Sequence, residues 1–113
     1  MNDPIDIDDY TLPQYIVMHL ISKSPKSCSA IIREAIDKFG DMIEHGPYIY
    51  GEYSDEIDEG TKALIYEGIA QYVGDQWRSI ELTDYGRKFY DEFVNGGEFE
   101  DEEWEKARRR MVE

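Results

Sequence analysis

The apolar and polar positions along the chain predict four helices and a β-hairpin within residues 11–95. From residue 11 to residue 21, apolar side chains recur every three or four positions and also fill most of the positions between. We therefore expect this first helix to lie at the centre of the fold. Residues 22–27 have the composition of a loop. A second helix is predicted from residue 28 to residue 44, and its single apolar stripe consists of Ile32, Ala35, Ile36, Phe39, Met42 and Ile43.

Residues 46–53 interrupt the helical pattern with two glycines and a proline. The three tyrosines in this stretch favour a short extended segment packed on the core. Ser54 is a suitable N-cap for a third helix, because acidic residues in the turns that follow it interact favourably with the helix dipole. Gly68 suits the position just after the end of that helix.

A β-hairpin is predicted after the third helix. Residues 69–73 have the composition of a strand, and residues 74–76 that of a tight turn. Residues 77–82 alternate apolar and polar side chains, as a half-buried strand does.

A fourth helix is predicted from Asp84 to about Val94, with Thr83 as its N-cap. Its third residue is Gly86, and the missing side chain allows another backbone segment to approach closely. The run Asn95-Gly96-Gly97 ends this helix.

The two ends of the chain differ from the central domain in composition. Residues 1–10 contain four acids and no base, which is typical of a solvated lead-in. Residues 96–113 form a charged tail in which Trp104 and Met111 lie on one helical stripe, so a short fifth helix is predicted there. Because the core pattern ends near Phe93, we expect this tail to pack on a second copy of the chain and form a homodimer.

Composition narrows the classes of function. The 113 residues include 26 acids and 12 bases, giving a formal charge of −14, and residues 11–95 remain acidic when both ends are left out. General binding to nucleic acid or to an anionic membrane needs basic side chains and is therefore disfavoured. A single cysteine excludes an internal disulfide, and no apolar run approaches the ~20 residues of a membrane span. We expect a cytoplasmic protein.

Few residues have the spacing of a catalytic or metal site. His19 and His45 have no second histidine or cysteine at the spacing of metal ligands. Cys28 lies at the start of a helix, where the dipole lowers a thiol pKa, but the sequence places no base beside it, so a structural role is expected. No nucleophile–base pair or phosphate-binding loop is present in the sequence. We therefore expect no catalysis, no cofactor and no bound metal.

Two segments carry a resemblance to a known family. YGEYSDEIDEGTKALIYEGIA, residues 50–70, and IELTDYGRKFYDEF, residues 80–93, resemble the corresponding parts of winged-helix domains in prokaryotic transcriptional regulators. The chain departs from the family pattern at Glu52, where a proline is usual. The resemblance implies a small α+β winged-helix domain over residues 11–95. Such a domain has three helices, a β-hairpin wing and one or two C-terminal helices.

DNA binding in transcriptional regulation is the function that the resemblance implies. In such domains the third helix enters the major groove and the wing contacts the backbone. We therefore expect a dimeric transcriptional regulator that binds duplex DNA. The candidate DNA contacts, which are basic or polar residues of the first loop, the third helix and the wing, are Lys23, Lys26, Lys62, Gln76 and Arg78.

The charge of the third helix favours an alternative function. Four acids in its first turns would face the phosphates of DNA. The alternative is an acidic winged-helix module that binds a basic protein, or mimics nucleic-acid charge, and does not bind DNA. The residues assigned to that interaction are Asp55, Glu56, Asp58, Glu59, Trp104 and Met111.

Overall fold

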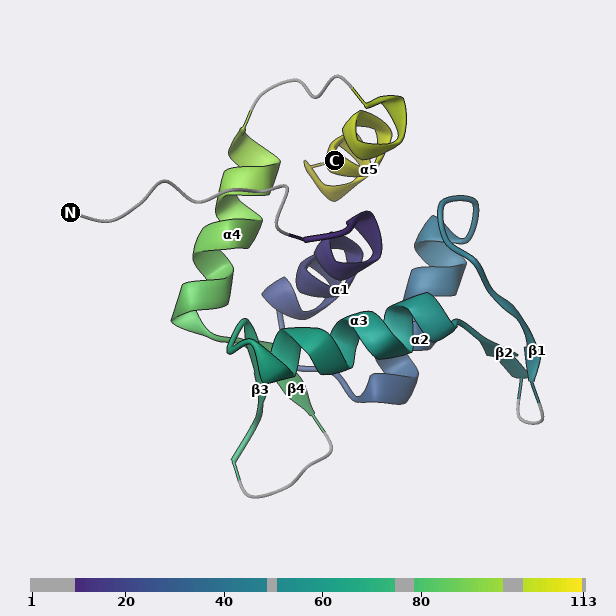
Figure 1. Cartoon of the computed structure of the whole chain (residues 1–113), viewed down its shortest axis with the longest axis horizontal. Helices are drawn as coiled ribbons and strands as arrows, with labels where there is room; N and C mark the ends of the chain where they lie inside the picture. Colours follow the sequence, from purple (N-terminus) through teal and green to yellow (C-terminus); the bar gives the residue numbers. More distant parts are fainter. Residues whose placement is uncertain (1–9, 49–50, 75–78, 97–100, 113) are drawn as a thin grey trace.

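The computed structural model of the protein describes residues 10–48, 51–74, 79–96 and 101–112. Within these residues the chain forms an α+β fold with five helices and two antiparallel two-stranded sheets (Figure 1). The expected α+β class is confirmed. The elements in chain order are α1 (Leu12–Ser22), α2 (Cys28–Phe39), β1 (Gly46–Tyr48), β2 (Gly51–Tyr53), α3 (Asp55–Tyr66), β3 (Ala70–Tyr72), β4 (Ile80–Leu82), α4 (Asp84–Asn95) and α5 (Glu102–Val112).

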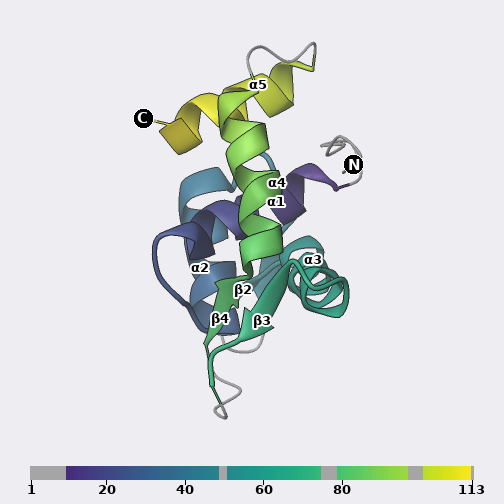
Figure 2. The ribbon, with the colours of Figure 1, turned by 90° about the vertical axis from the view of Figure 1, so that its left-hand side faces the viewer.

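α1 is the central element, as its apolar pattern predicted. It contacts α2, α3, α4 and α5, and Figures 1 and 2 show these helices arranged around it. Four consecutive side chains, from Tyr15 to Met18, have no exposed surface. A helix that is apolar nearly all round is stable only when neighbours cover every side of it. Its start is fixed by the Thr11 backbone N–H, which donates to Gln14 Oε1 at 2.8 Å.

α2 ends five residues earlier than the predicted residue 44. The Ser27 hydroxyl caps its start by accepting a hydrogen bond from the backbone N–H of Ala30 at 3.1 Å. Gly40 is the C-cap, and the Met42 N–H turns back to the Phe39 carbonyl at 2.9 Å. Glycine weakens a helix interior, so the chain leaves the helix there. Ile43 is still buried, because the turn itself carries it to the core.

The extended segment predicted at residues 46–53 is a β-hairpin. Gly46 pairs with Tyr53, Pro47 with Glu52, and Tyr48 with Gly51, so β1 and β2 run antiparallel. The described residues of this stretch are therefore extended, as predicted, and the pairing of the two strands, which the sequence did not indicate, satisfies their backbone polar groups. Of its three tyrosines, Tyr53 is partly buried against the core.

The second hairpin, β3–β4, follows α3 as predicted, with shorter strands. Ala70 pairs with Leu82 and Tyr72 with Ile80. The loop before α2 adds one more pair to β4: the Lys26 N–H donates to the Ile80 carbonyl at 3.0 Å, and the Ile80 N–H donates to the Lys26 carbonyl at 2.8 Å. The predicted turn is described only at Gly74, whose φ is +60°.

α4 begins with the cap and the close approach that the sequence predicted. The Thr83 hydroxyl accepts a hydrogen bond from the Gly86 N–H at 3.0 Å. The same hydroxyl lies 2.7 Å from the Gly68 carbonyl oxygen and 3.0 Å from that of Ile69. A side chain at Gly86 would place its Cβ 2.0 Å from the Ile69 oxygen. The backbone after α3 and the start of α4 therefore pack without an intervening side chain.

α5 packs on the core of its own chain, which corrects the sequence interpretation. The Trp104 ring meets Tyr15 and Phe93 at centroid distances of 5.7 and 5.9 Å, and Met111 is buried. The apolar stripe of α5 covers a hydrophobic face left by α1 and α4. The reason for expecting a dimer through this tail is therefore wrong, and a homodimer stays a prediction.

Tyr10 corrects the prediction that residues 1–10 are a solvated lead-in. It is buried, and its ring lies edge-on to those of Tyr15 and Phe89 at 6.3 and 5.0 Å. Tyr10 therefore does not belong to the predicted solvated lead-in, because an aromatic ring next to α1 gains more from burial than from solvation. Residues 1–9 lie outside the described residues. None of the described helices has the length and the apolar character that crossing a membrane requires.

Candidate functional site

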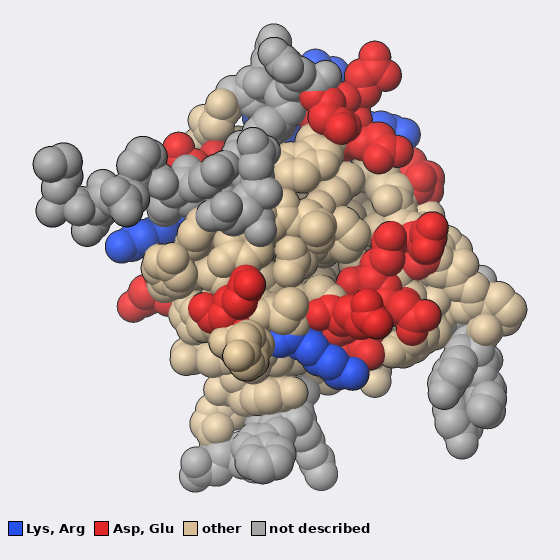
Figure 3. Space-filling model, viewed as in Figure 1, with Lys and Arg blue, Asp and Glu red and all other residues tan. Residues whose placement is uncertain are grey.

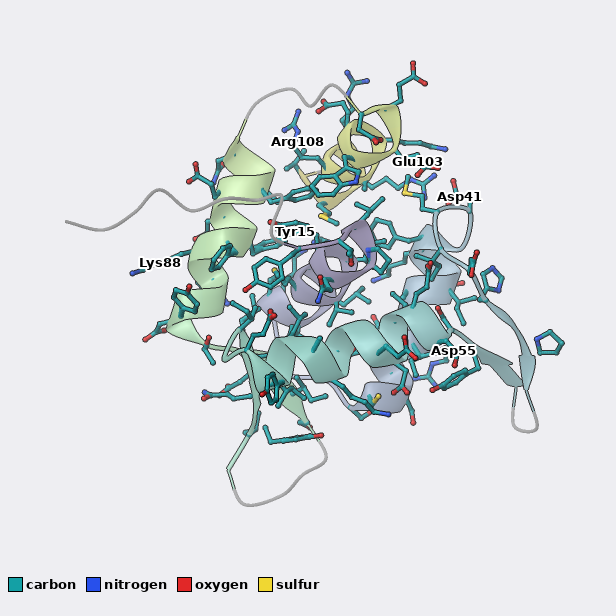
Figure 4. All side chains as sticks on the ribbon, viewed as in Figure 1. Tyr15, Asp41, Asp55, Lys88, Glu103 and Arg108 are labelled. Carbon is teal, nitrogen blue, oxygen red and sulfur yellow. The ribbon has the colours of Figure 1, made fainter. Side chains whose placement is uncertain are left out.

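The start of α3 is fixed to the turn that follows α2. The Ser54 hydroxyl, fully buried, donates to the Glu44 carbonyl at 2.6 Å and accepts from the Ile57 N–H at 3.4 Å. In return, the Glu44 N–H donates to Glu56 Oε2 at 3.1 Å. Ser54 thus caps the helix as predicted, and Glu56 is already used within the fold. Figure 4 shows Asp55 at this end of α3, beside β2.

Asp58 accepts hydrogen bonds from three neighbouring side chains. The Tyr53 hydroxyl donates to Oδ2 at 2.6 Å, the Lys62 ammonium donates to the same oxygen at 2.9 Å, and the Cys28 thiol donates to Oδ1 at 3.5 Å. Burial acts to raise the pKa of Asp58, but these hydrogen bonds outweigh it and hold the pKa below the usual range. Asp58 therefore joins α2, β2 and α3 and is not available to a partner.

Asp58 also affects the protonation state of Cys28 and Tyr53. Burial, together with the charge of Asp58, raises the pKa of the Cys28 thiol, so the thiol stays protonated despite its place at the start of α2. The hydrogen bond to Asp58 raises the pKa of the Tyr53 hydroxyl above its usual range. Both groups act as structural donors, and the thiolate that a nucleophile requires is disfavoured here.

Two of the three lysines predicted to contact DNA, Lys26 and Lys62, lie beside carboxylates. Lys62 is paired with Asp58, which raises the pKa of its ammonium, and Lys26 lies 3.3 Å from Glu34. Lys23 is exposed and forms no ion pair within the described residues. Gln76 and Arg78 lie outside the described residues. The described lysines therefore do not form a common basic surface.

One face of α3 is exposed along its whole length. Asp55, Glu59, Lys62 and Tyr66 follow one another at intervals of four, three and four residues, which places them on the same side of the helix. In Figure 3, acidic side chains gather on this side of the molecule over the N-terminal half of α3. Within the described part of the chain, Asp55 and Glu59 form no ion pair. We refer to these four residues as the α3 face.

The six residues assigned to protein interaction do not form one surface. Met111 is buried and Trp104 is partly buried against the core under α5, which lies across α1 from α3 (Figures 1 and 2). Sequence reasoning also missed Tyr66, whose side chain is 92% exposed at the end of α3. The sequence did contain a signal for it, because Tyr66 continues the helical spacing of Asp55, Glu59 and Lys62.

His19 has a structural environment, as expected from the sequence. Its Nδ1 and the Tyr90 hydroxyl share a hydrogen bond of 2.7 Å, and its ring lies edge-on to Phe39. Burial, with Lys23 and Lys38 nearby, lowers the pKa of His19 from 6.5 to about 4, so the imidazole is neutral at pH 7. Across the described segments, no three histidine, cysteine, aspartate or glutamate side chains are grouped to hold a metal ion.

Comparison of the chain with family models, with curated proteins and with solved structures finds no match.

Proposed function

We propose that the chain is a winged-helix protein whose α3 face binds a basic segment of another protein. The order of its elements supports the winged-helix assignment, because three helices precede the β3–β4 hairpin and α4 follows it directly. The backbone pair between Lys26 and Ile80 adds support, since it attaches the loop before α2 to the hairpin. The resemblance over residues 50–70 and 80–93 points to the same family.

The charge of the α3 face is the observation that carries the functional part of the proposal. Asp55 and Glu59 are exposed, while the single base of α3, Lys62, is neutralised by Asp58 at 2.9 Å. Phosphates approaching this face would meet uncompensated carboxylates, whereas basic side chains would be attracted to them. A basic protein segment therefore fits the surface better than duplex DNA does.

A DNA-binding transcriptional regulator is the second candidate. The exposed bases Lys23 and Arg33 favour it, because neither forms an ion pair in the part of the chain that the structure describes. In this alternative the first loop and the wing contact the phosphates, and the α3 acids select against wrong sites. Its contacts would include Lys62 and Arg78, so replacing both with alanine weakens DNA binding and lowers the salt slope by roughly one unit per lost contact.

A fluorescence titration at low and at moderate salt separates the two functions. The labelled probes are a generic duplex DNA and a lysine- and arginine-rich peptide. We expect the peptide to bind the wild-type protein and the duplex not to bind. The variant Asp55→Ser with Glu59→Gln should lose peptide binding, because complementary charge sets encounter rate and register.

The matched control removes the same charge from a different surface. Asp91 and Glu92 are exposed on α4, so Asp91→Asn with Glu92→Gln changes the net charge equally and leaves the α3 face intact. Equal loss in both double variants would mean that the peptide responds only to overall charge, and the proposal would be wrong. Duplex binding with a steep salt dependence would instead support the regulator.

A further inference from the structure

Tyr66 is the most exposed large apolar residue of the described structure. It is the last residue of α3, and 92% of its surface is in contact with solvent. Tyr72, on the neighbouring strand β3, is 42% exposed. The Ile69 N–H donates to the Leu64 carbonyl at 2.9 Å, which holds the start of β3 against the end of α3. Tyrosine is enriched at the centres of protein interfaces, where its ring becomes buried on binding.

The charges around Tyr66 are predominantly negative. Lys62 precedes it by one helical turn, but its ammonium is held by Asp58. Glu59 lies two turns before Tyr66 on the same face, and Glu67 is the next residue in the chain. Both glutamates are exposed and form no ion pair within the described residues. A cation bound at the ring would therefore have one exposed carboxylate two helical turns before Tyr66 and another on the residue that follows it.

We propose that Tyr66 receives an arginine side chain of the basic partner, with the guanidinium stacked on the ring and paired with Glu59 or Glu67. This inference rests on the proposed function and names the residue type that the α3 face selects. Arginine fits better than lysine, because its planar guanidinium stacks on an aromatic face and donates two parallel hydrogen bonds to a carboxylate. The lysine ammonium is more strongly hydrated and can do neither as well.

Two peptides of equal charge test the selection. One alternates arginine with glycine, and the other has lysine in place of each arginine. We expect the arginine peptide to bind the full-length protein about two- to fivefold more tightly, which is the usual range for a cation–π contact at an exposed site. Tyr66→Ala should weaken binding of the arginine peptide more than binding of the lysine peptide, so that the two affinities become equal. Tyr66→Phe should keep the advantage, because the ring remains.

Tyr85→Ala is the matched control. Tyr85 is also an exposed tyrosine, 54% in contact with solvent, but it lies on α4, so its loss should leave the preference for arginine intact. Circular dichroism of each variant confirms that the fold is retained.

The outcomes of these titrations separate the role of Tyr66 from the proposed binding of basic segments by the α3 face. Equal affinity of the wild-type protein for both peptides, or an arginine preference that survives in Tyr66→Ala, overturns the role of Tyr66 while the α3 face still binds basic segments. Failure of both peptides to bind at low salt overturns both proposals. Binding of single-stranded oligothymidylate that Tyr66→Ala abolishes would assign the ring to base stacking and also overturn the inference.

Discussion

His19 shows how a single residue can link stability to pH. It is neutral in the folded protein because the ring is largely buried against Phe39 and Tyr90, with two lysines near enough to oppose a further positive charge. An unfolded chain has no such constraint, so its histidine takes up a proton at the ordinary pKa.

We expect the fold to lose stability as the pH falls below 6.5. Between pH 6.5 and about 4, the unfolded chain binds a proton at His19 that the folded chain does not bind, so the equilibrium shifts towards unfolding. The loss between pH 7 and 5.5 should be at most about 1 kcal/mol, because the ring is partly in water. Urea unfolding measures it, and His19→Gln should show a smaller decline over this range. An equal decline in both proteins would assign the effect to other groups.

Gly86 is a residue whose missing side chain the packing requires. We expect Gly86→Ala to destabilise the protein by roughly 2–4 kcal/mol, because its Cβ would lie 2.0 Å from the Ile69 carbonyl oxygen and the backbone would have to move. Gly46→Ala is the control, since no atom lies within 4 Å of the added Cβ, and its effect should stay within about 0.5 kcal/mol. Similar urea midpoints for Gly86→Ala and wild type would contradict the close approach.

At the scale of elements, the Thr83 hydroxyl contributes three contacts to the junction between α3, β3 and α4. Thr83 begins α4 by capping the Gly86 N–H, and it also contacts the carbonyl groups of Gly68 and Ile69. The cap therefore joins the end of one helix to the start of another.

Thr83→Ala should lower the free energy of unfolding by about 1–2 kcal/mol, the usual result of losing an N-cap. Thr83→Ser keeps the hydroxyl and should recover most of the loss. Chemical denaturation of the three proteins makes the comparison. If serine were as destabilising as alanine, the methyl group of Thr83 and not its hydrogen bonds would matter.

At the scale of the whole molecule, α5 closes the core. Arg110 donates two hydrogen bonds of 2.7 Å to Asp41, on the turn after α2, and Lys106 adds a third at 3.1 Å. These hydrogen bonds lower the pKa of Asp41 below its usual range, and those from Arg110 have the largest effect. Arg108 pairs with Glu105 and reaches the Val94 carbonyl at 3.3 Å (Figure 4). The basic end of α5 is therefore used within the fold.

Met111→Ala should destabilise the protein by about 2–4 kcal/mol, because the side chain is buried between α5 and the rest of the core. Val112→Ala, at an adjacent position that is 55% exposed, should change stability by less than about 0.5 kcal/mol. Thermal melts compare the two, and light scattering measures the mass of each variant. A Met111→Ala protein that melts like wild type but has lost half its mass would place α5 between two copies of the chain.

Local signals in the sequence determined much of this protein. The 3.6-residue periodicity placed α1, α3, α4 and α5, because it reports which side of a helix avoids water. The N-caps at Ser54 and Thr83 were also predictable, because each accepts a hydrogen bond from a backbone N–H three residues later. The close approach at Gly86 was predictable because glycine has no side chain to prevent it. The central position of α1 followed from its lack of a polar side.

Only the tertiary structure decided what these elements pack against. The stripe on α5 predicted burial of Trp104 and Met111, but an apolar stripe does not say whether its own core or a second copy covers it. The pairing of β1 with β2 and the hydrogen bonds from Cys28 and Tyr53 to Asp58 join residues that are distant in the chain or lack any periodic signal. Burial can be predicted from local pattern, whereas the choice of partner depends on how all the elements fill one volume together.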